Sequence, residues 1–366
     1  MPREAYPAAR AVSPKLHAYF ASQIAGREDG PRGRASVPDT QTIESIIDAA
    51  FWASLRREEG YIPRISLAFL SPEQATQALI FERRLPVDPA VLTRVSPAVE
   101  RAGIHLGVWR DNENGLSVWG AARGTPAFCF VVEVAAAGLI VIKNHSAERA
   151  GKFVNVAVLE GDQVKVVDLV ASGVPDDPSL LGFDSPVSWA HSSNLLLQLA
   201  VSMRTLGHGG TLLVVPSENE SWRHSIVPPI PYALQPRFSG LAHLSHHDPE
   251  KEQRTIDAIA GLTAVDGAVV LTDRYEVLGF GAKIMRRKGR AQVEQLRIVE
   301  PIEGGVAALA HPEQLGGTRH LSAAQFVQDQ RDAVALVASQ DQRFTVFQWS
   351  LREQIVHAHR MEALLL

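Results

Sequence analysis

The chain has 366 residues, of which 46% are hydrophobic and 21% charged, and its formal net charge is -4. The length allows two domains, and the composition is ordinary for a soluble globular protein. The net negative charge gives no reason to expect nucleic acid or a membrane as a partner. The one cysteine, Cys129, cannot form an intramolecular disulfide, which fits the cytoplasmic location we expect.

The N-terminal third is predicted to begin with irregular chain and continue with helices. Residues 1–38 contain Pro, Arg and Gly and show no apolar core of a signal peptide, so we expect an irregular segment. Asp39 or Thr40 is expected to cap a helix. The apolar residues of that helix recur at helical spacing: Ile43, Ile46, Ile47, Ala50, Phe51 and Leu55. A short strand is predicted at 65–70, and Ser71-Pro72-Glu73 is expected to open the next helix.

From residue 103 to 168 the pattern changes to that of strands. Hairpins are predicted at 104–121, around the turn that contains Asn114-Gly115, and at 153–169. The longest apolar stretch, 127–142, is interrupted by Glu133 and is too short to span a membrane, so we interpret it as two buried strands. The sequence thus predicts an α+β domain over 39–180, with a domain break near 174–178.

The C-terminal half, 186–355, alternates helices with buried strands and is predicted to be an α/β domain. Helices are expected at 192–206, 249–260 and 323–330, and strands at 211–215, 265–271, 277–280, 332–338 and 344–347. Two histidines, His357 and His359, are placed on a charged C-terminal helix at the surface.

Two short motifs in this half carry chemistry. Asp266-Gly267-Ala268 puts an acid and a glycine before an apolar strand, where a carboxylate can hold a metal. The segment 316–322, with Gly317-Thr318-Arg319-His320 inside it, puts glycines, a hydroxyl and a cation at a helix start, where phosphate binds well. Taken singly, the first is also typical of a turn before a strand, and the second of a helix start with Thr318 as its cap and with Arg319 and His320 solvated.

Together these motifs resemble the diadenylate cyclase (DAC) domain, which condenses two ATP into cyclic di-AMP. The Asp-Gly-Ala motif of that family is intact, and its Gly-Thr-Arg-His-Arg motif is present except that Leu321 replaces the last Arg. The order of predicted elements over about 190–350 is also similar. The resemblance implies a mixed central sheet flanked by helices. The whole chain resembles the bacterial type termed DACNV, in which a probable sensor domain precedes a DAC-like domain.

The resemblance implies roles for individual residues. Asp266, Arg319 and His320 would be catalytic, and Asp266 and Asp341 would bind a divalent metal, Mg or Mn. The substrate-binding residues would be Gly267, Ala268, Gly317, Thr318 and Ser322. ATP and cyclic di-AMP would be the partners. Because each such domain holds one ATP, the active form would be a homo-oligomer of face-to-face protomers.

Two departures from the family pattern favour an alternative. Leu321 removes a cation, and Ser339-Gln340-Asp341 stands where typical members have Ser-Glu-Glu. Basic residues between the motifs could supply charge or form a solvated loop: Lys283, Arg286, Arg287, Lys288 and Arg290. The alternative is a catalytically degenerate domain that binds ATP or a cyclic dinucleotide as a sensor.

Overall fold

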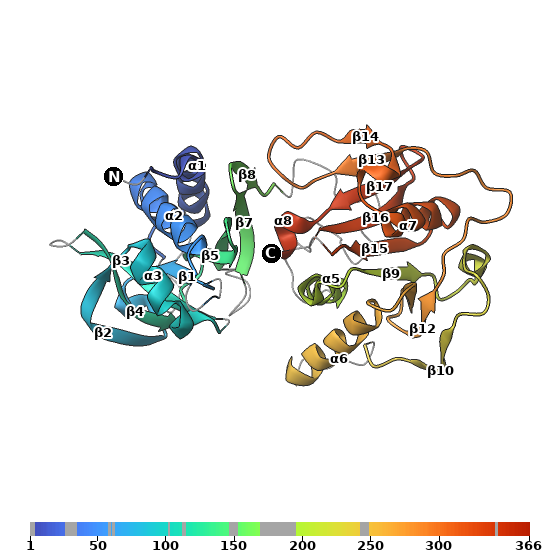
Figure 1. The fold of residues 1–366 in the computed structure, drawn as a ribbon, viewed down its shortest axis with the longest axis horizontal. Helices are drawn as coiled ribbons and strands as arrows, with labels where there is room; N and C mark the ends of the chain where they lie inside the picture. Colours follow the sequence, from blue (N-terminus) through green and yellow to red (C-terminus); the bar gives the residue numbers. More distant parts are fainter. Residues whose placement is uncertain are drawn as a thin grey trace. The chain divides into compact units, whose positions relative to one another are not determined.

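The computed structural model describes residues 4–25, 35–57, 60, 63–101, 103–111, 115–145, 153–168, 195–241, 249–340 and 343–366. The chain divides into two compact units, Met1–Val167 with Leu366, and Asp168–Leu365. Each unit is built on one large mixed sheet with helices (Figure 1). The domain break expected at 174–178 lies outside the described residues.

The first unit contains an eight-stranded sheet in the order β2-β4-β3-β1-β5-β6-β7-β8. Among the described strands, β1 and β3 pair in parallel and the other neighbours are antiparallel. In chain order the elements are α1 (Pro7–Ile24), α2 (Thr40–Ser54), β1 (Ser66–Phe69), η1 (Pro72–Gln74), β2 (Gln77–Pro86), α3 (Pro89–Val95), η2 (Ser96–Val99), β3 (Ile104–Asp111), β4 (Gly115–Arg123), β5 (Phe130–Ala136), β6 (Leu139–His145), β7 (Phe153–Glu160) and β8 (Gln163–Val166). The expected α+β character is therefore observed.

Two segments of this unit differ from the sequence prediction. Pro7–Ile24 is a helix, not irregular chain, because Val12, Leu16 and Phe20 recur every four residues and are buried, while α1 packs along α2. The segment after Ser71 makes only one 3-10 turn and then becomes strand β2, which pairs with β4. Pro72 and a capping box favour a helical turn locally, but pairing with β4 makes the residues that follow a strand.

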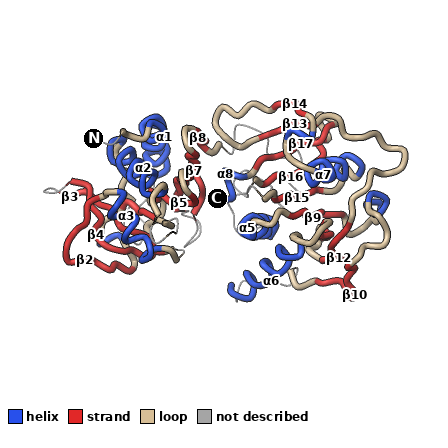
Figure 2. Tube along the Cα trace, in the orientation of Figure 1, coloured by secondary structure: helices blue, strands red, loops and turns tan. Residues whose placement is uncertain are grey.

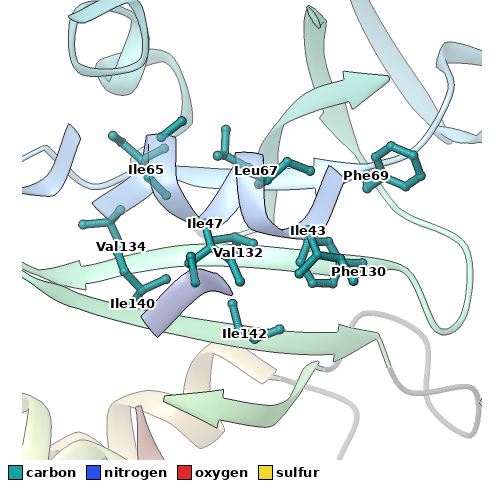
Figure 3. Close-up of a cluster of buried hydrophobic side chains, with 14 of the residues drawn as sticks. Ile43, Ile47, Ile65, Leu67, Phe69, Phe130, Val132, Val134, Ile140 and Ile142 are labelled. Atoms are coloured by element: carbon teal, nitrogen blue, oxygen red, sulfur yellow. The ribbon is translucent and has the colours of Figure 1, made fainter. Parts of the chain in front are cut away.

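The main core of the unit lies between α2 and the sheet, as Figure 3 shows. Asp39 caps α2, since its carboxylate accepts a hydrogen bond of 2.7 Å from the Thr42 N–H. The helix then presents Ile43 and Ile47 to alternate residues of three strands. Figure 3 labels the residues of this core outside the helix: Ile65, which directly precedes β1, and the strand residues Leu67, Phe69, Phe130, Val132, Val134, Ile140 and Ile142.

The opposite face of the same sheet carries polar groups among apolar ones. His105 is buried, and its Nδ1 lies 2.7 Å from the Ser66 hydroxyl. The Phe153 ring contacts the rings of both His105 and His145, with centroids 5.3 and 5.0 Å apart. Burial lowers the pKa of His105 from 6.5 to about 4. His105 is therefore neutral near pH 7.

The second unit has a nine-stranded sheet in the order β10-β12-β11-β9-β15-β16-β17-β13-β14. Its elements, shown by type in Figure 2, are α5 (Leu195–Leu206), β9 (Gly210–Val215), η4 (Ser221–Ser225), β10 (Tyr232–Phe238), α6 (Pro249–Leu262), β11 (Ala268–Thr272), β12 (Val277–Ala282), β13 (Leu296–Val299), β14 (Ala308–Ala310), η5 (Pro312–Gln314), α7 (Thr318–Asp329), β15 (Val334–Ala338), β16 (Phe344–Ser350), β17 (Ile355–Arg360) and α8 (Glu362–Leu365).

Helices cover both faces of this sheet. Along β9, Leu212 belongs to an apolar cluster with α5 and α6, and Leu213 to a second cluster with α7. Successive residues of a strand point to opposite faces, so α7 lies on the other side of the sheet from α5 and α6. All six residues of β9 are buried, as predicted for a central strand.

The C-terminal end was predicted wrongly. His357 and His359 lie on strand β17, not on a surface helix, and both are buried. β17 pairs with β13 on one side and β16 on the other, and these neighbours remove it from solvent. Among the described residues, no helix is both long and apolar enough to cross a membrane.

We predict that His105 makes the first unit sensitive to acid. The unfolded chain takes up a proton on this residue below about pH 6.5, and the folded chain does so only near pH 4. Stability is therefore retained above pH 6.5 and lost as the pH falls toward 4, by about 2 kcal/mol between pH 7 and pH 5. His105→Gln should reduce that loss. Pulse proteolysis in urea, with fragments assigned to residues 4–168, measures it, and an unchanged pH dependence would contradict the prediction.

Candidate functional site

Strand register brings four distant segments to one edge of the second sheet. Ala268, the first residue of β11, pairs with Thr211 at the start of β9 and with Ala282 at the end of β12. On the other side of β9, Ala338 at the end of β15 pairs with Gly210. The residues just beyond these strand ends therefore meet at this edge.

A pocket of about 790 Å³ lies at this edge. Its walls are Thr211, Asp266, Gly267, Ala268, Ala282, Lys283, Ile284, Leu315, Gly316, Gly317, Thr318, Arg319, His320, Ser322, Val337, Ala338, Ser339, Gln340 and Arg343. Both sequence motifs thus line one cavity, although about fifty residues separate them in the chain. Every candidate site residue from the sequence is present except Asp341, which lies outside the described residues.

Asp266 stands immediately before β11, and its side chain is 89% exposed. Its carboxylate forms a short ion pair with the ammonium group of Lys283, which follows β12 and is 50% exposed. This hydrogen bond and the charge of Lys283 hold the pKa of Asp266 below its ordinary value, and Arg319 adds a smaller effect. Asp266 is therefore an ionised carboxylate that faces solvent in the pocket.

Gly267 is required by the packing beneath Asp266. Its φ is +114°, which side chains rarely adopt, and a Cβ there would lie 2.4–2.8 Å from backbone atoms of Gly281. The sequence suggested that this glycine lets a nucleotide approach the backbone. The structure adds a packing reason for this glycine, because its backbone lies against that of Gly281, and this contact sets Asp266 beside Lys283.

The start of α7 forms the opposite wall of the pocket. Gly317 is the N-cap residue and Thr318 is the first helical residue, and no side chain in the described part of the chain caps the helix there. The sequence interpretation with Thr318 as the cap is therefore wrong by one residue. The first N–H groups of a helix lack partners within the helix and carry partial positive charge, so this end of α7 suits an anion.

Arg319 and His320 occupy different environments. The guanidinium of Arg319 reaches the strand ends, where its Nη1 would lie 3.2 Å from a Cβ at Gly209. His320 is only 3% exposed, and its Nε2 lies 3.5 Å from the Thr345 hydroxyl. Its ring packs edge-on against Phe347. His320 is thus mostly covered by the sheet, and the solvated histidine that one interpretation expected is not observed.

The segment that carries Lys283 is tied to the far end of α7. Asp329 accepts a 2.7 Å hydrogen bond from the Arg287 N–H, and the Gln325 Oε1 accepts one of 2.9 Å from the Val293 N–H. Burial raises the pKa of Asp329. Of the basic residues expected either to supply charge or to form a solvated loop, Lys283 lines the pocket, and the four from Arg286 to Arg290 are not among its described lining residues.

Sequence reasoning did not select Arg343 or Thr211, both of which line the pocket. Arg343 directly precedes β16, and the signal that could have identified it is a cation at a turn next to a motif strand. Leu321, in contrast, is absent from the lining residues and packs against the apolar cluster under α7. The position that departs from the family motif is therefore occupied by a partly buried apolar side chain.

The pocket fits a metal ion that arrives with a polyphosphate, but not one held by protein groups alone. Among the described residues, no group of three or more His, Cys, Asp or Glu side chains could hold a metal. Mg²⁺ usually takes one or two carboxylates and completes its coordination with water and substrate phosphates. The exposed carboxylate of Asp266 meets that requirement.

Part of the first unit is similar to a known protein family. Residues 32–123 match a protein family described as "Probable sensor domain DACNV". The match runs from the segment before α2 to the end of β4, so it lies within the first unit. No curated protein matches the chain.

One solved structure that matches is described as the hypothetical membrane spanning protein from Bacillus cereus, with 19% sequence identity and a TM-score of 0.28. The match covers 46% of this chain and 63% of that chain, less than two thirds of its length. With so low a TM-score, this likeness supports no statement on fold or function.

We predict opposite effects for alanine at two glycines of the second unit. Gly267→Ala should destabilise the unit by about 1–3 kcal/mol through its backbone conformation, with the overlap on Gly281 in addition. Gly261→Ala, inside α6 with no atom within 4 Å of the new Cβ, should be neutral or stabilise by up to about 1 kcal/mol. Urea unfolding measures both, and equal effects would refute the packing argument.

Removal of Lys283 should raise the pKa of Asp266 toward its ordinary value, because Lys283 is the main cause of its depression. The measurement is an NMR titration of the Asp266 carboxyl carbon in the parent and in Lys283→Met. Lys288→Met serves as the matched control, since Lys288 is not a lining residue. The same shift in both variants would show that the ion pair does not form in solution.

Proposed function

We propose that the second unit binds ATP in this pocket and that the protein is a diadenylate cyclase-like enzyme, which condenses two ATP into cyclic di-AMP. The observation that carries the proposal is the shared pocket. It gathers Asp266-Gly267-Ala268 and Gly317-Thr318-Arg319-His320 from two remote parts of the chain. A carboxylate opposite a cationic helix start is the arrangement that a nucleoside triphosphate with a divalent metal requires.

In the proposed reaction each 3'-hydroxyl oxygen bonds to the α-phosphorus of the other nucleotide. The bond from that phosphorus to the oxygen of the leaving pyrophosphate breaks, and each hydroxyl releases its proton to solvent. Two ATP thus give one cyclic di-AMP and two pyrophosphates. Arg319 and the first amides of α7 would hold the phosphates and compensate the charge that develops on them. Thr318 and Ser322 would donate hydroxyl hydrogen bonds. A Cβ at Gly317 would have no described residue within 4 Å, which leaves room for a phosphate.

Asp266 would hold the divalent metal, Mg or Mn, which when bound neutralises phosphate charge and activates the hydroxyl. The ionised state of Asp266 supports this role. Lys283 would have to release the carboxylate as the metal enters, and its 50% exposure leaves it free space in which to move. His320 of α7 packs against Thr345 and Phe347 of β16. It would therefore position Thr318 and Arg319 and would not touch a phosphate directly.

Because one pocket holds one nucleotide in this proposal, the reaction needs two protomers whose pockets face each other. The segment matched to a probable sensor domain supports a regulatory role for the first unit. In the proposed protein this unit would control how the two catalytic units meet.

A second function is favoured by two observations. Lys283 already pairs with the carboxylate that the metal would need, and Leu321 is part of the apolar packing and cannot contribute charge. Both features suit a domain that binds ATP or cyclic di-AMP without turnover and reports its presence.

One incubation separates the two functions. We expect purified protein with ATP and Mn²⁺ to yield cyclic di-AMP and pyrophosphate, resolved by chromatography, and Asp266→Asn to yield neither. Calorimetry on the same samples measures nucleotide binding. Binding without product in the parent would refute the cyclase in favour of the binder, and the absence of both product and binding would refute nucleotide recognition by this pocket.

A further inference from the structure

The pocket carries more positive charge than its sequence motifs account for. Among the described lining residues, Lys283, Arg319 and Arg343 are cations, and Asp266 is the carboxylate that opposes them. The ammonium group of Lys283 is engaged by Asp266. Arg319 and Arg343 add two guanidinium groups, which bind phosphate well, to the lining of the pocket.

Arg343 is held at a defined place in this wall. The Ser339 N–H donates a 2.9 Å hydrogen bond to the Arg343 carbonyl oxygen, and the next residue, Phe344, pairs with Ala338. These contacts close the turn between β15 and β16. The backbone of Arg343 is thus fixed to the strand that ends at the pocket.

Arg319 approaches the same turn from helix α7. A Cβ at Gly209 would lie 3.2 Å from Arg319 Nη1, 3.3 Å from Gln340 Cγ and 3.4 Å from the Ala338 carbonyl oxygen. The Arg319 guanidinium, Gln340 and the end of β15 therefore converge on one point. Arg343 comes three residues after Gln340 in the chain and also lines the pocket, so both arginines belong to the wall near the end of β15.

We propose that Arg319 and Arg343 together form a two-arginine phosphate clamp, in which Arg343 is the second phosphate-binding cation of the site. This inference rests on the proposed nucleotide function and identifies the group of the ligand that Arg343 recognises. A guanidinium presents two parallel N–H donors that match two phosphate oxygens, so two arginines can bind a polyphosphate chain at adjacent phosphates. Position 321 cannot take this part, since Leu321 packs into the apolar cluster.

The clamp predicts which part of a nucleotide each substitution affects. Arg343 would contact phosphates and not the base or ribose, so the loss of affinity on its removal should increase with the number of phosphates. A merely structural role would weaken adenosine, AMP, ADP and ATP alike. The series therefore distinguishes recognition from a general disturbance of the pocket.

The test is calorimetric titration of the full chain with adenosine, AMP, ADP and ATP. We expect Arg343→Ala to weaken ATP binding about 10- to 100-fold, the effect of losing a hydrogen bond to a charged group, and to leave adenosine binding unchanged. Arg343→Lys keeps the positive charge but loses the two parallel N–H donors of the guanidinium. Its affinity for ATP should lie between that of the parent and that of Arg343→Ala. Arg286→Ala is the matched control, because Arg286 is exposed and is not a lining residue.

The outcomes separate this inference from the proposed function. If the parent and Arg343→Ala bind ATP equally well, the clamp is refuted while nucleotide binding by the pocket is confirmed. An equal loss for all four ligands would also overturn it. A parent that binds none of them would overturn both. Unfolding in urea at the same midpoint as the parent confirms that each variant is folded.

Discussion

The close approach of Gly267 to the backbone of Gly281 is the constraint on which the pocket depends. It joins the start of β11 to the end of β12 with no side chain between them, and so sets Asp266 next to Lys283. β11 is also paired in parallel with β9, whose other neighbour is β15. One backbone contact and the register of four strands therefore assemble one whole wall of the site.

Helix α7 both packs on the sheet and forms part of the pocket. Its apolar face, with Ala323, Phe326 and Val327, packs on the sheet, while its N-terminal residues line the pocket. His320 is buried, and Leu321 is partly buried against the apolar cluster. These two side chains pack against the sheet and its apolar cluster and do not supply charge to the pocket. Among the described lining residues, the cations other than Arg319 are Lys283 and Arg343, which lie next to strand ends.

The two faces of the sheet in the first unit differ in polarity. Helix α2 covers one face of its sheet with an apolar core, and the other face buries a histidine bonded to a serine. A buried imidazole is stable only while neutral, because desolvation penalises its charged form. The family match covers α2 to β4 and ends before β5, although β5 continues the same sheet beside β1. The structural unit is therefore larger than the matched segment.

The sequence by itself determined the buried strands β9, β11 and β15, the helix α2 with its Asp39 cap, and the two motifs that chemistry requires. Strands buried on both faces are apolar throughout, and caps depend on adjacent residues, so local sequence is enough for these. Only the tertiary structure decided that Pro7–Ile24 is a helix, that His357 lies on a strand, and that Arg343 reaches the pocket. These depend on partners far along the chain: α1 is held by α2, β17 by β13 and β16, and Arg343 by the turn that returns β15 to β16. Periodicity and composition do not indicate which distant residues will contact each other in the folded chain.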